Sequence, residues 1–352
     1  MLNNEMAPVP DTEVLSLGLP PEQPETSSNH QIKTGTSMNT LAPIALGTWS
    51  WGAGFAGGDQ VFGNHLTDDQ MQAVFETALK TGLTLWDTAA VYGMGTSETS
   101  LGKLVKQHTR NELVLSTKFT PQIADERSEA PVAAMLESSL QRLGGDYIDL
   151  YWIHNPHDVE KWTPGLIPLL KSGKIRRVGV SNHNLAQIKR ANEILGAAGF
   201  AISAVQNHYS LLYRSSEEAG ILDYCKQNNI TFFAYMVLEQ GALSGRYNSQ
   251  NPLQEGSGRA TSYNKVLPQL ETLTTAMTEI GSRYHASAAQ IAIAWAIAKG
   301  TLPIIGATKV HHVTDAAQAA AIQLTNAEME QLEMLAHATG VDTRGAWEQP
   351  MA

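Results

Sequence analysis

Short apolar runs rich in branched and aromatic residues recur eight times along the chain, and this repetition constrains the fold more than any other feature. The runs span residues 44–49, 83–89, 113–119, 146–154, 176–182, 202–210, 230–238 and 302–308. Amphipathic helical patterns lie between them, for example at 68–82, 130–144 and 185–199, each with a glycine near its end. Eight strand–helix units in about 300 residues predict an α/β fold, a single-domain (β/α)8 TIM barrel. A doubly wound open sheet is the alternative.

The first 30 residues differ from the rest of the chain. They are rich in Pro, Glu, Ser, Thr and Asn without a sustained period, so residues 1–30 are predicted to form a disordered arm and residues 31–352 the barrel domain. Residues 31–42 alternate weakly and could form a small hairpin. Residues 241–261, after the seventh run, are predicted to be an insertion or flexible loop.

Composition excludes several classes of partner and site. The net charge is −10 without a basic run, which disfavours nucleic acid as a partner. Cys225 is the only cysteine, so no internal disulfide can form, and a reducing, cytoplasmic location is expected. No apolar run reaches 18 residues, so no membrane span is predicted. The oligomeric state is not determined by the sequence.

Polar side chains gather at the predicted ends of three consecutive strands. Asp87 ends the second strand with Tyr92 in the loop beyond, Lys118 ends the third strand and His154 ends the fourth. Each residue alone is more often a helix cap, a packing aromatic, a solvated amine or a core histidine. In a barrel, however, the strand ends converge on one mouth, so the four side chains are expected to meet there.

A shared site for these four side chains suits proton transfer to a carbonyl oxygen. A buried Lys118 needs a carboxylate partner such as Asp87. The phenol of Tyr92 has an ordinary pKa near 10, and the positive charge of Lys118 is expected to lower that pKa and make Tyr92 a proton donor. His154 would hydrogen-bond the carbonyl or the phenol. Because no side chain can deliver hydride, a nicotinamide cofactor is implied.

The four residues and their surroundings resemble the catalytic tetrad of the aldo-keto reductase superfamily. The similarity runs from about residue 41 to about residue 323 and includes LGTWSWG (46–52), LQRLGGDYIDLYWIH (140–154), SGKIRRVGVSN (172–182) and VQNHYSLLYR (205–214). The resemblance implies a TIM barrel that binds NADPH in an extended form. It also implies reduction of aldehydes or ketones to alcohols without a metal or flavin.

The resemblance assigns cofactor contacts position by position. Amide side chains near the strand ends match the nicotinamide carboxamide, and an aromatic side chain matches the ring that stacks on the nicotinamide. A glycine-rich loop with an arginine matches the pyrophosphate. The residues implied for these contacts are Gly47, Thr48, Trp49, Ser181, Asn182, Gln206, Tyr235, Met236, Leu238, Gly241, Leu243, Gly245 and Arg246. Met236 departs from the family, which often has Ser or Pro at this position, and this removes one possible hydroxyl contact to the phosphates.

The segment after the eighth strand resembles the family's site for the adenosine 2′-phosphate. The residues implied there are Gly306, Thr308 and Lys309, and His312 and Asp315 occupy further positions of this site where the family often has other residues. A helix N-terminus beside a lysine suits an anion. NADPH is therefore expected in preference to NADH, because an NAD-selective site would present an acid instead.

Aromatic side chains near the predicted strand ends are candidates for an apolar substrate pocket. They are Trp51, Phe55, Phe62, Phe119 and Trp152, together with Trp347 in a C-terminal segment that could fold over the mouth. The expected substrate is a small carbonyl compound. A sugar, a ketoaldehyde or pyridoxal are all open, because loops decide specificity.

Other interpretations of the same residues remain. The chain could serve as a cofactor-binding regulatory subunit with little turnover, or as a lyase or hydrolase that uses Lys118 as a Schiff base. GAGFAG at 52–57 matches a dinucleotide-binding pattern, but no helix is expected before Thr67, so that interpretation is disfavoured. No metal is expected, because His154 and His157 lack a third ligand at suitable spacing.

Overall fold

Eight parallel strands close into a barrel in the computed structural model, which describes residues 42–352. The strands follow chain order around the barrel, and β8 pairs with β1 to close it. Their bounds are β1 Ala45–Gly47, β2 Leu85–Asp87, β3 Val114–Phe119, β4 Leu150–Ile153, β5 Val178–Ser181, β6 Ala204–His208, β7 Thr231–Tyr235 and β8 Leu302–Gly306. The predicted TIM barrel is confirmed. The predicted arm and all but the last residue of the proposed hairpin lie outside the described residues, and the domain boundary stays a prediction.

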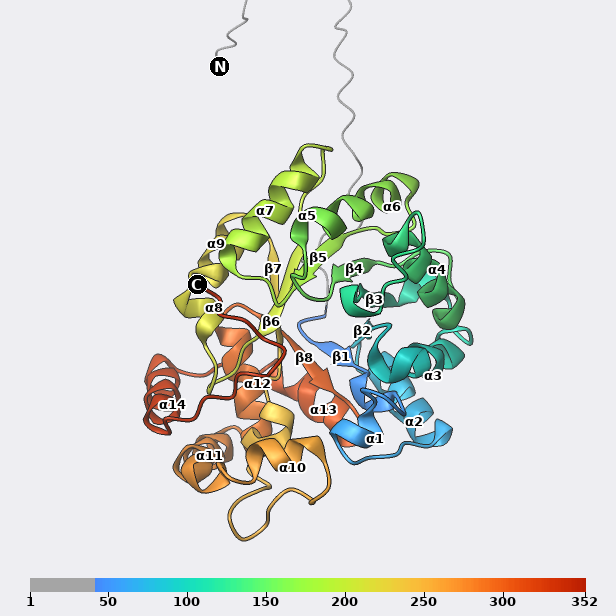
Figure 1. Ribbon diagram of the computed structural model, residues 1–352. Helices are drawn as coiled ribbons and strands as arrows, with labels where there is room; N and C mark the ends of the chain where they lie inside the picture. The colour runs from blue at the N-terminus through green and yellow to red at the C-terminus, as the bar shows by residue number, and fades with distance from the viewer. Residues whose placement is uncertain (1–41) are drawn as a thin grey trace, which may run out of the picture. The chain divides into compact units, whose positions relative to one another are not determined.

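Helices surround the strands, as Figure 1 shows. The helices are α1 Gly58–Val61, α2 Asp68–Lys80, α3 Thr96–Val105, α4 Pro131–Leu143, α5 Val159–Trp162, α6 Ile167–Ser172, α7 Leu185–Gly196, α8 Ser215–Glu218, α9 Ile221–Gln227, α10 Gly258–Tyr263, α11 Leu267–Arg283, α12 Ala288–Ala298, α13 Val310–Ala319 and α14 Asn326–Ala338. Short 3-10 turns lie between these elements: η2 Trp49–Trp51, η3 Tyr92–Gly95, η4 Arg110–Glu112, η5 Pro121–Ile123, η6 Thr163–Leu166 and η7 Glu239–Ser244. Among the described residues, no helix is long and apolar enough to cross a membrane.

Local sequence signals explain where several of the longer helices begin. Thr67, Asn184, Ser287 and Thr325 each accept a hydrogen bond from the backbone three residues later, and a Gln or Glu side chain there bonds back. Such capping boxes satisfy backbone N–H groups that the first helical turn leaves free. At the other end of α4, Gly144 adopts a left-handed conformation that ends the helix.

Two loop predictions need correction. A helix begins directly after GAGFAG, because α1 starts at Gly58, although none was expected before Thr67. Gly58 packs so closely against Ser50 that a Cβ would lie 2.4 Å from the Ser50 carbonyl oxygen, which explains the glycine by tertiary packing. Part of the predicted loop 241–261 is also helical, since Ser257 caps α10. Leu253 is buried and anchors this loop to the domain.

Side chains fill the barrel interior below the carboxyl ends of the strands. Trp152 and Phe233 pack edge to face with ring centroids 5.2 Å apart. A Cβ on Gly179 would lie 2.3 Å from the Trp152 ring, so the indole occupies the space a larger residue would need. Leu85 and Leu150 complete this layer. The polar residues at the carboxyl ends of the strands therefore have the other end of the barrel as their common mouth.

Candidate active site

Adjacent strands bring the four predicted catalytic residues together. Asp87 is the last residue of β2, Lys118 lies in β3, and His154 follows β4 directly. The register pairs Asp87 with Ser116 across β2 and β3, which brings Lys118 to the mouth beside the carboxylate. Tyr92 opens the turn η3 beyond β2.

The Lys118 ammonium connects the site. Its Nζ donates to Asp87 Oδ2 at 2.5 Å and to the Thr88 carbonyl at 2.8 Å. The same nitrogen lies 3.4 Å from the Tyr92 hydroxyl oxygen. Asp87 is fixed from its other side, because its Oδ1 accepts a hydrogen bond from Ser116 at 2.6 Å and one from Gln206 at 3.2 Å. Lys118 and Asp87 are both buried, so the pair forms one balanced, water-excluded unit.

Burial and neighbouring charge set the protonation states. Burial penalises the charged form of Lys118, but Asp87 and Tyr92 reverse that effect and raise the pKa of the ammonium above its ordinary value. Burial also raises the pKa of Tyr92, and Lys118 only partly offsets it while Asp87 adds to it. The expected net lowering of the Tyr92 pKa is therefore not observed, because desolvation outweighs the lysine's charge. Tyr92 is a neutral phenol beside a permanent cation.

His154 supplies a neutral imidazole at the same place. Its Nδ1 lies 2.8 Å from the Thr120 hydroxyl, and its ring centroid lies 5.8 Å from that of Tyr92. Burial, followed by the charge of Lys118, lowers the pKa of His154 well below its ordinary value. The imidazole can therefore hydrogen-bond a neutral carbonyl without competing with Lys118 for charge.

The turn after β2 has the conformation that aims the phenol at Lys118. Gly93, Met94 and Gly95 all have positive φ, at 57°, 50° and 92°. A Cβ on Gly93 would lie 2.1 Å from the Thr96 hydroxyl, so this step needs glycine. The Trp49 ring stacks on Tyr92 at 5.5 Å with an angle of 18° between the planes. The backbone of the turn and the stacked Trp49 ring therefore both fix the position of the Tyr92 phenol.

The residues predicted to hold the nicotinamide lie beside the tetrad. Asn182 Nδ2 donates to the His154 carbonyl at 2.9 Å, and the Tyr235 hydroxyl donates to Asn182 Oδ1 at 2.5 Å. Ser181 ends β5, and its hydroxyl oxygen accepts a hydrogen bond from Asn182 Nδ2 at 3.2 Å. The Gln206 side chain donates to Asp87, as described above. Donors and acceptors suited to an amide therefore surround the position next to Tyr92 and Lys118. Gly47 and Thr48 lie at the end of β1, where Thr48 bonds Ser97 at 2.9 Å.

The predicted pyrophosphate loop is the turn η7 and its continuation. Gly241 and Gly245 have positive φ of 105° and 74°. Met236, before the turn, also has a positive φ. Leu243 is fully buried, so its contribution to a ligand would come through the backbone, and Leu238 is half-buried. Arg246 is exposed at the end of the loop.

The predicted phosphate site lies at the N-terminus of α13. Lys309 is the residue before the helix, and Gly306 ends β8. The backbone N–H of Thr308 donates to the His312 ring at 3.3 Å. Burial first, together with the neighbouring His311, Lys309 and Arg246, lowers the pKa of His312 to about 4. This region is therefore electropositive, whereas Asp315 lies one turn further along the helix.

The aromatic candidates for the substrate pocket divide into two groups. Trp51, Phe119 and Trp152 are buried in the core and leave no surface for a substrate. Phe55 and Trp347 are exposed by 68% and 52%, and Phe62 packs edge to face on Trp49 at 5.2 Å. Trp347 lies 6.4 Å from Trp49 and donates to the Tyr235 hydroxyl at 3.3 Å. Phe62 and Trp347 therefore adjoin the tetrad through Trp49, whose ring stacks on Tyr92.

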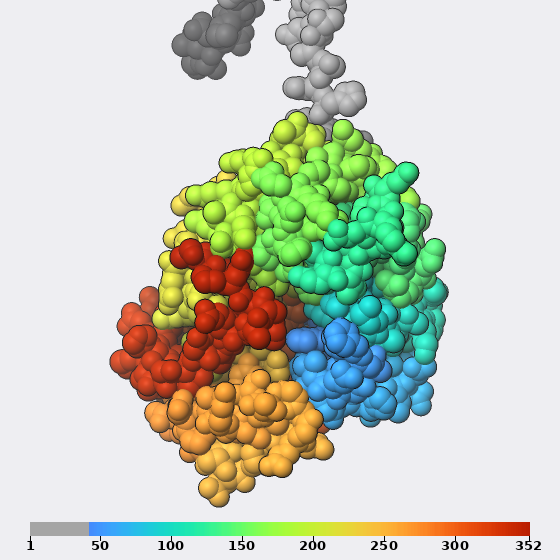
Figure 2. Space-filling model, viewed as in Figure 1, coloured from blue at the N-terminus to red at the C-terminus, as the bar shows by residue number. Residues whose placement is uncertain are grey.

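Sequence reasoning missed a second polar cluster at the mouth. Glu348, next to Trp347, accepts hydrogen bonds from Tyr235 and His208, and His208 also contacts Glu239. Figure 2 shows the red C-terminal segment lying across this face of the molecule, next to the blue residues at the start of the described chain. The available signal was His208 inside the sixth apolar run and Glu239 directly after the seventh.

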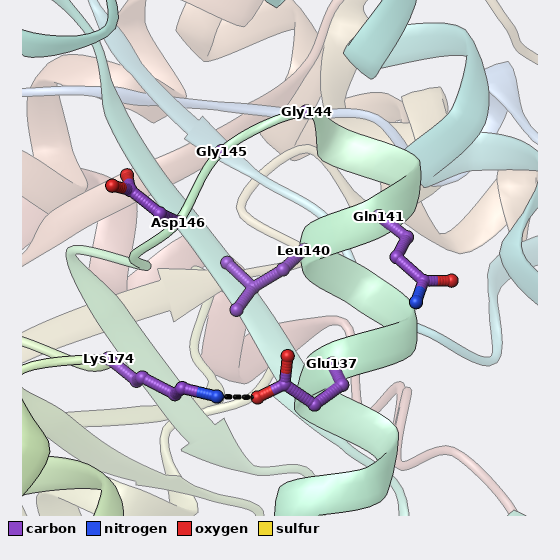
Figure 3. Close-up of a pocket in the computed structure, with 7 residues that line it drawn as sticks. All are labelled: Glu137, Leu140, Gln141, Gly144, Gly145, Asp146 and Lys174. Carbon is purple, nitrogen blue, oxygen red and sulfur yellow. Dashed lines mark hydrogen bonds and ion pairs between the residues drawn. The ribbon is translucent and has the colours of Figure 1, made fainter.

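A separate surface hollow lies away from this site. It is lined by residues of α4, the turn after it and one lysine: Glu137, Leu140, Gln141, Gly144, Gly145, Asp146 and Lys174. Figure 3 shows Lys174 paired with Glu137 across this hollow. The turn between α4 and β4 belongs to the opposite end of the barrel from the tetrad. Among residues 42–352, no group of three or more His, Cys, Asp or Glu side chains could hold a metal ion.

Comparison with known proteins agrees with this geometry. A model of the aldo/keto reductase family matches residues 43–337. A chloroplastic pyridoxal reductase from Arabidopsis thaliana is 35% identical over 313 residues, which cover 84% of this chain and 84% of the relative. The aldo-keto reductase yakc of Schizosaccharomyces pombe, named with NADP(+), is 33% identical over 285 residues, 76% of this chain and 82% of the relative.

Solved structures give the same result. An aldo-keto reductase from Klebsiella pneumoniae in complex with NADPH superimposes with a TM-score of 0.65 at 28% identity, covering 84% of this chain and 91% of that one. A glycerol dehydrogenase from Gluconobacter oxydans has a TM-score of 0.72 at 25% identity with the same coverage. The barrel, the matched residues and these relatives show that the chain is an NADP-dependent oxidoreductase and belongs to the aldo/keto reductase family.

Proposed function

We propose that the protein reduces an aldehyde or ketone to an alcohol with NADPH and that Tyr92 donates the proton. The observation that carries the proposal is the buried chain of contacts from Asp87 through Lys118 to the Tyr92 hydroxyl. A carbonyl reductase needs a proton donor whose anion is stabilised after transfer. The chain of contacts supplies both, because a fixed ammonium adjoins the phenol.

The residues divide the proton chemistry among them. The Tyr92 phenol is neutral at neutral pH and transfers its proton to the oxygen of the carbonyl as that oxygen gains negative charge. Lys118 then stabilises the phenolate, and Asp87 keeps Lys118 charged and in position. The neutral His154 hydrogen-bonds the carbonyl oxygen and orients the carbonyl group. When bound, the nicotinamide supplies the hydride that forms the new carbon–hydrogen bond.

The mouth fits the nicotinamide end of such a cofactor. Ser181, Asn182 and Gln206 offer hydroxyl and amide groups, which suit a carboxamide. Tyr235, which bonds Asn182, offers a ring face for stacking. These residues adjoin Tyr92 and Lys118, as hydride and proton delivery to one carbonyl group requires.

The region around α13 supports NADPH as the preferred cofactor. The positive charges of Lys309 and Arg246 both help to lower the pKa of His312, so both lie near this ring. Lys309 also precedes a helix whose N-terminal N–H groups favour an anion. An additional phosphate on the cofactor would be attracted to these charges. NADH lacks that phosphate and would gain nothing from them.

Aromatic side chains around the mouth favour a flat or aromatic aldehyde as substrate. Trp49 stacks on Tyr92, and Trp347 and Phe62 pack edge to face against Trp49. The relative named as a pyridoxal reductase makes pyridoxal the first compound to try.

A cytoplasmic location remains part of the proposal and is supported by the absence of a second cysteine.

The geometry disfavours a Schiff-base role for Lys118. A nucleophilic amine must be neutral, whereas Asp87 at 2.5 Å keeps this amine protonated. A regulatory subunit with little turnover would need no such proton-donating arrangement. Failure of turnover despite cofactor binding would nevertheless favour that role.

The first experiment measures NADPH consumption by the purified protein with pyridoxal, benzaldehyde and an aliphatic aldehyde, after the affinity for NADPH has been measured by fluorescence. Tight binding with aldehyde-dependent consumption supports the proposal. Tight binding without consumption of NADPH by any aldehyde or ketone contradicts carbonyl reduction and supports a regulatory role.

A second experiment tests the phosphate site. Lys309→Ala is expected to weaken NADPH binding by about tenfold, because a charged hydrogen bond to phosphate is lost, and to leave NADH binding unchanged. Lys103→Ala is the control, since Lys103 pairs only with Asp68 on the surface. Equal losses for both cofactors would remove Lys309 from the phosphate site.

A further inference from the structure

Three buried side chains form a charged cluster beside Tyr235, which we name the clasp: His208, Glu239 and Glu348. His208 ends β6, Glu239 opens η7, and Glu348 belongs to the C-terminal segment beyond α14. His208 Nε2 lies 2.9 Å from Glu239 Oε1, and Nδ1 lies 2.9 Å from Glu348 Oε1. All three side chains are fully shielded from solvent. Through the His208 imidazole, the clasp therefore joins the predicted pyrophosphate loop at η7 to the C-terminal segment.

The geometry makes His208 a cation. Each ring nitrogen faces a carboxylate oxygen, and a carboxylate can only accept, so both nitrogens must carry hydrogen. Burial acts against this charge, but Glu239 and Glu348 outweigh it and raise the pKa of His208 to about 9. With Glu239 and Glu348 as carboxylates, the clasp contains one positive and two negative charges.

The charges within the clasp do not balance. Glu239 receives further hydrogen bonds from Ser210, from Tyr263 at 2.6 Å and from Thr343 at 3.0 Å. Glu348 receives one hydrogen bond from His208 and one from Tyr235 at 3.1 Å, and it also interacts with the Tyr213 phenol. Its Oε2 has no hydrogen-bond partner among the described residues. Within residues 42–352, no lysine or arginine pairs with either carboxylate. One negative charge is thus left over, and it resides at Glu348.

This uncompensated charge lies next to the proposed cofactor and substrate site. The Tyr235 hydroxyl that bonds Glu348 also bonds Asn182, and Trp347 donates to the same hydroxyl. The ring of His208 packs nearly parallel to that of Tyr235, with centroids 5.5 Å apart. The other facing groups, Tyr213 and Tyr263, are neutral phenols whose pKa values are raised by burial first. The tetrad does not cancel the charge, because Lys118 is already balanced by Asp87.

We propose that Glu348 makes the mouth selective for a positively charged pyridinium ring. The inference rests on the proposed function, because that function brings such a ring to Tyr235. Two ligands carry this chemistry: the oxidised nicotinamide of the cofactor and a protonated pyridine in the substrate. In the first case the carboxylate favours bound NADP+ over NADPH, and the reduced cofactor becomes a stronger hydride donor. In the second case it selects heteroaromatic aldehydes such as pyridine carboxaldehydes.

The first test compares affinities for NADP+ and NADPH by fluorescence titration. Glu348→Gln removes the charge but keeps an acceptor for Tyr235 and His208. The ratio of the NADP+ to the NADPH dissociation constant is expected to rise about tenfold, the size of a nearby partly screened charge. Glu348→Asp should keep the wild-type ratio. Gln349→Ala is the control for loosening of the segment, because it removes only the 2.7 Å contact to Gln187.

The second test compares KM for 4-pyridinecarboxaldehyde, at a pH where its ring is protonated, with KM for the neutral isostere benzaldehyde. If Glu348→Gln raises the KM for 4-pyridinecarboxaldehyde but not the KM for benzaldehyde, the recognised ring is that of the substrate. A change only in the cofactor ratio identifies the nicotinamide. If neither quantity changes relative to Gln349→Ala, the proposal is overturned.

Glu348→Ala covers the possibility that Glu348→Gln does not fold, because it removes the same charge and leaves the buried Met351 of this segment in place. The same change in ratio is expected, and an unchanged ratio overturns the nicotinamide arm. A wild-type protein that binds NADPH but reduces no carbonyl contradicts the proposed function, while the cofactor ratio still tests the clasp.

Discussion

Two buried clusters of charge face the same mouth of the barrel and differ in their balance. In the tetrad, one ammonium meets one carboxylate, Lys118 with Asp87, at 2.5 Å. In the clasp, one imidazolium is shared by two carboxylates, Glu239 and Glu348. A balanced pair has a field that falls off quickly, so it acts on the proton of the phenol it touches. An unbalanced cluster acts on charge at longer range.

The clusters also differ in how the chain builds them. Strands β2, β3 and β4 bring the tetrad together through consecutive neighbours in the sheet. The clasp needs β6, η7 and a segment that returns after α14. Glu239 even adopts a positive φ of 46°, a conformation disfavoured for a residue with a side chain, which its hydrogen bonds help to hold. Removing parts of each cluster should therefore have different consequences.

The largest expected effect is on catalysis in the tetrad. Tyr92→Phe removes the proton donor, so kcat should fall by about a thousandfold while NADPH affinity stays within about twofold. Steady-state kinetics and fluorescence titration measure the two quantities. Tyr151→Phe is the control, because the buried Tyr151 hydroxyl has no hydrogen-bond partner among the described residues. Retained activity in Tyr92→Phe would contradict the proton assignment.

Replacing one member of the buried Lys118–Asp87 pair should strongly lower the free energy of unfolding. Lys118→Met leaves Asp87 buried without a cation, and the free energy of unfolding should fall by about 3–5 kcal/mol. The exposed pair between Lys103 and Asp68 is the control, and Lys103→Met should cost less than about 1 kcal/mol. Urea unfolding gives both values. Similar losses for the two variants would show that burial does not distinguish the pairs.

The clasp should make stability depend on pH in the alkaline range. The pKa of His208 is raised to about 9 in the folded protein, so its contribution is complete below its ordinary value near 6.5 and is lost as pH rises through about 9. The free energy of unfolding should fall by about 3 kcal/mol over this interval. His208→Gln should remove this part of the decline. Parallel pH profiles for the two proteins would argue against a charged His208.

The smallest expected effect comes from one peripheral hydrogen bond of the clasp. Thr343→Val removes one of the donors to Glu239, which should lower the free energy of unfolding by about 1 kcal/mol. Thr261→Val is the control, because the Thr261 hydroxyl makes only a 3.4 Å contact within α10. Thermal and urea unfolding can resolve this difference. No difference between the two variants would mean that the donor from Thr343 contributes nothing to the clasp.

Sequence patterns predicted the barrel and the meeting of the tetrad for a physical reason. Strand and helix periodicities are local, and parallel strands joined by helices align their carboxyl ends at one mouth. Asp87, Lys118 and His154 could therefore be brought together from their positions alone. The short helix α1 was missed, because Gly58 begins it through close packing on Ser50, which no local pattern encodes.

The sequence by itself determined the barrel, the family and the residues at the strand ends, because those depend on short-range periodicity and on motifs within single units. Only the tertiary structure decided which aromatic side chains are buried, since Trp51, Phe119 and Trp152 lie in the core whereas Trp347 lies at the mouth. It also decided that desolvation outweighs Lys118 at Tyr92. The clasp exists only because the last residues of the chain return to β6, and such a long-range contact leaves no periodic signal in the sequence.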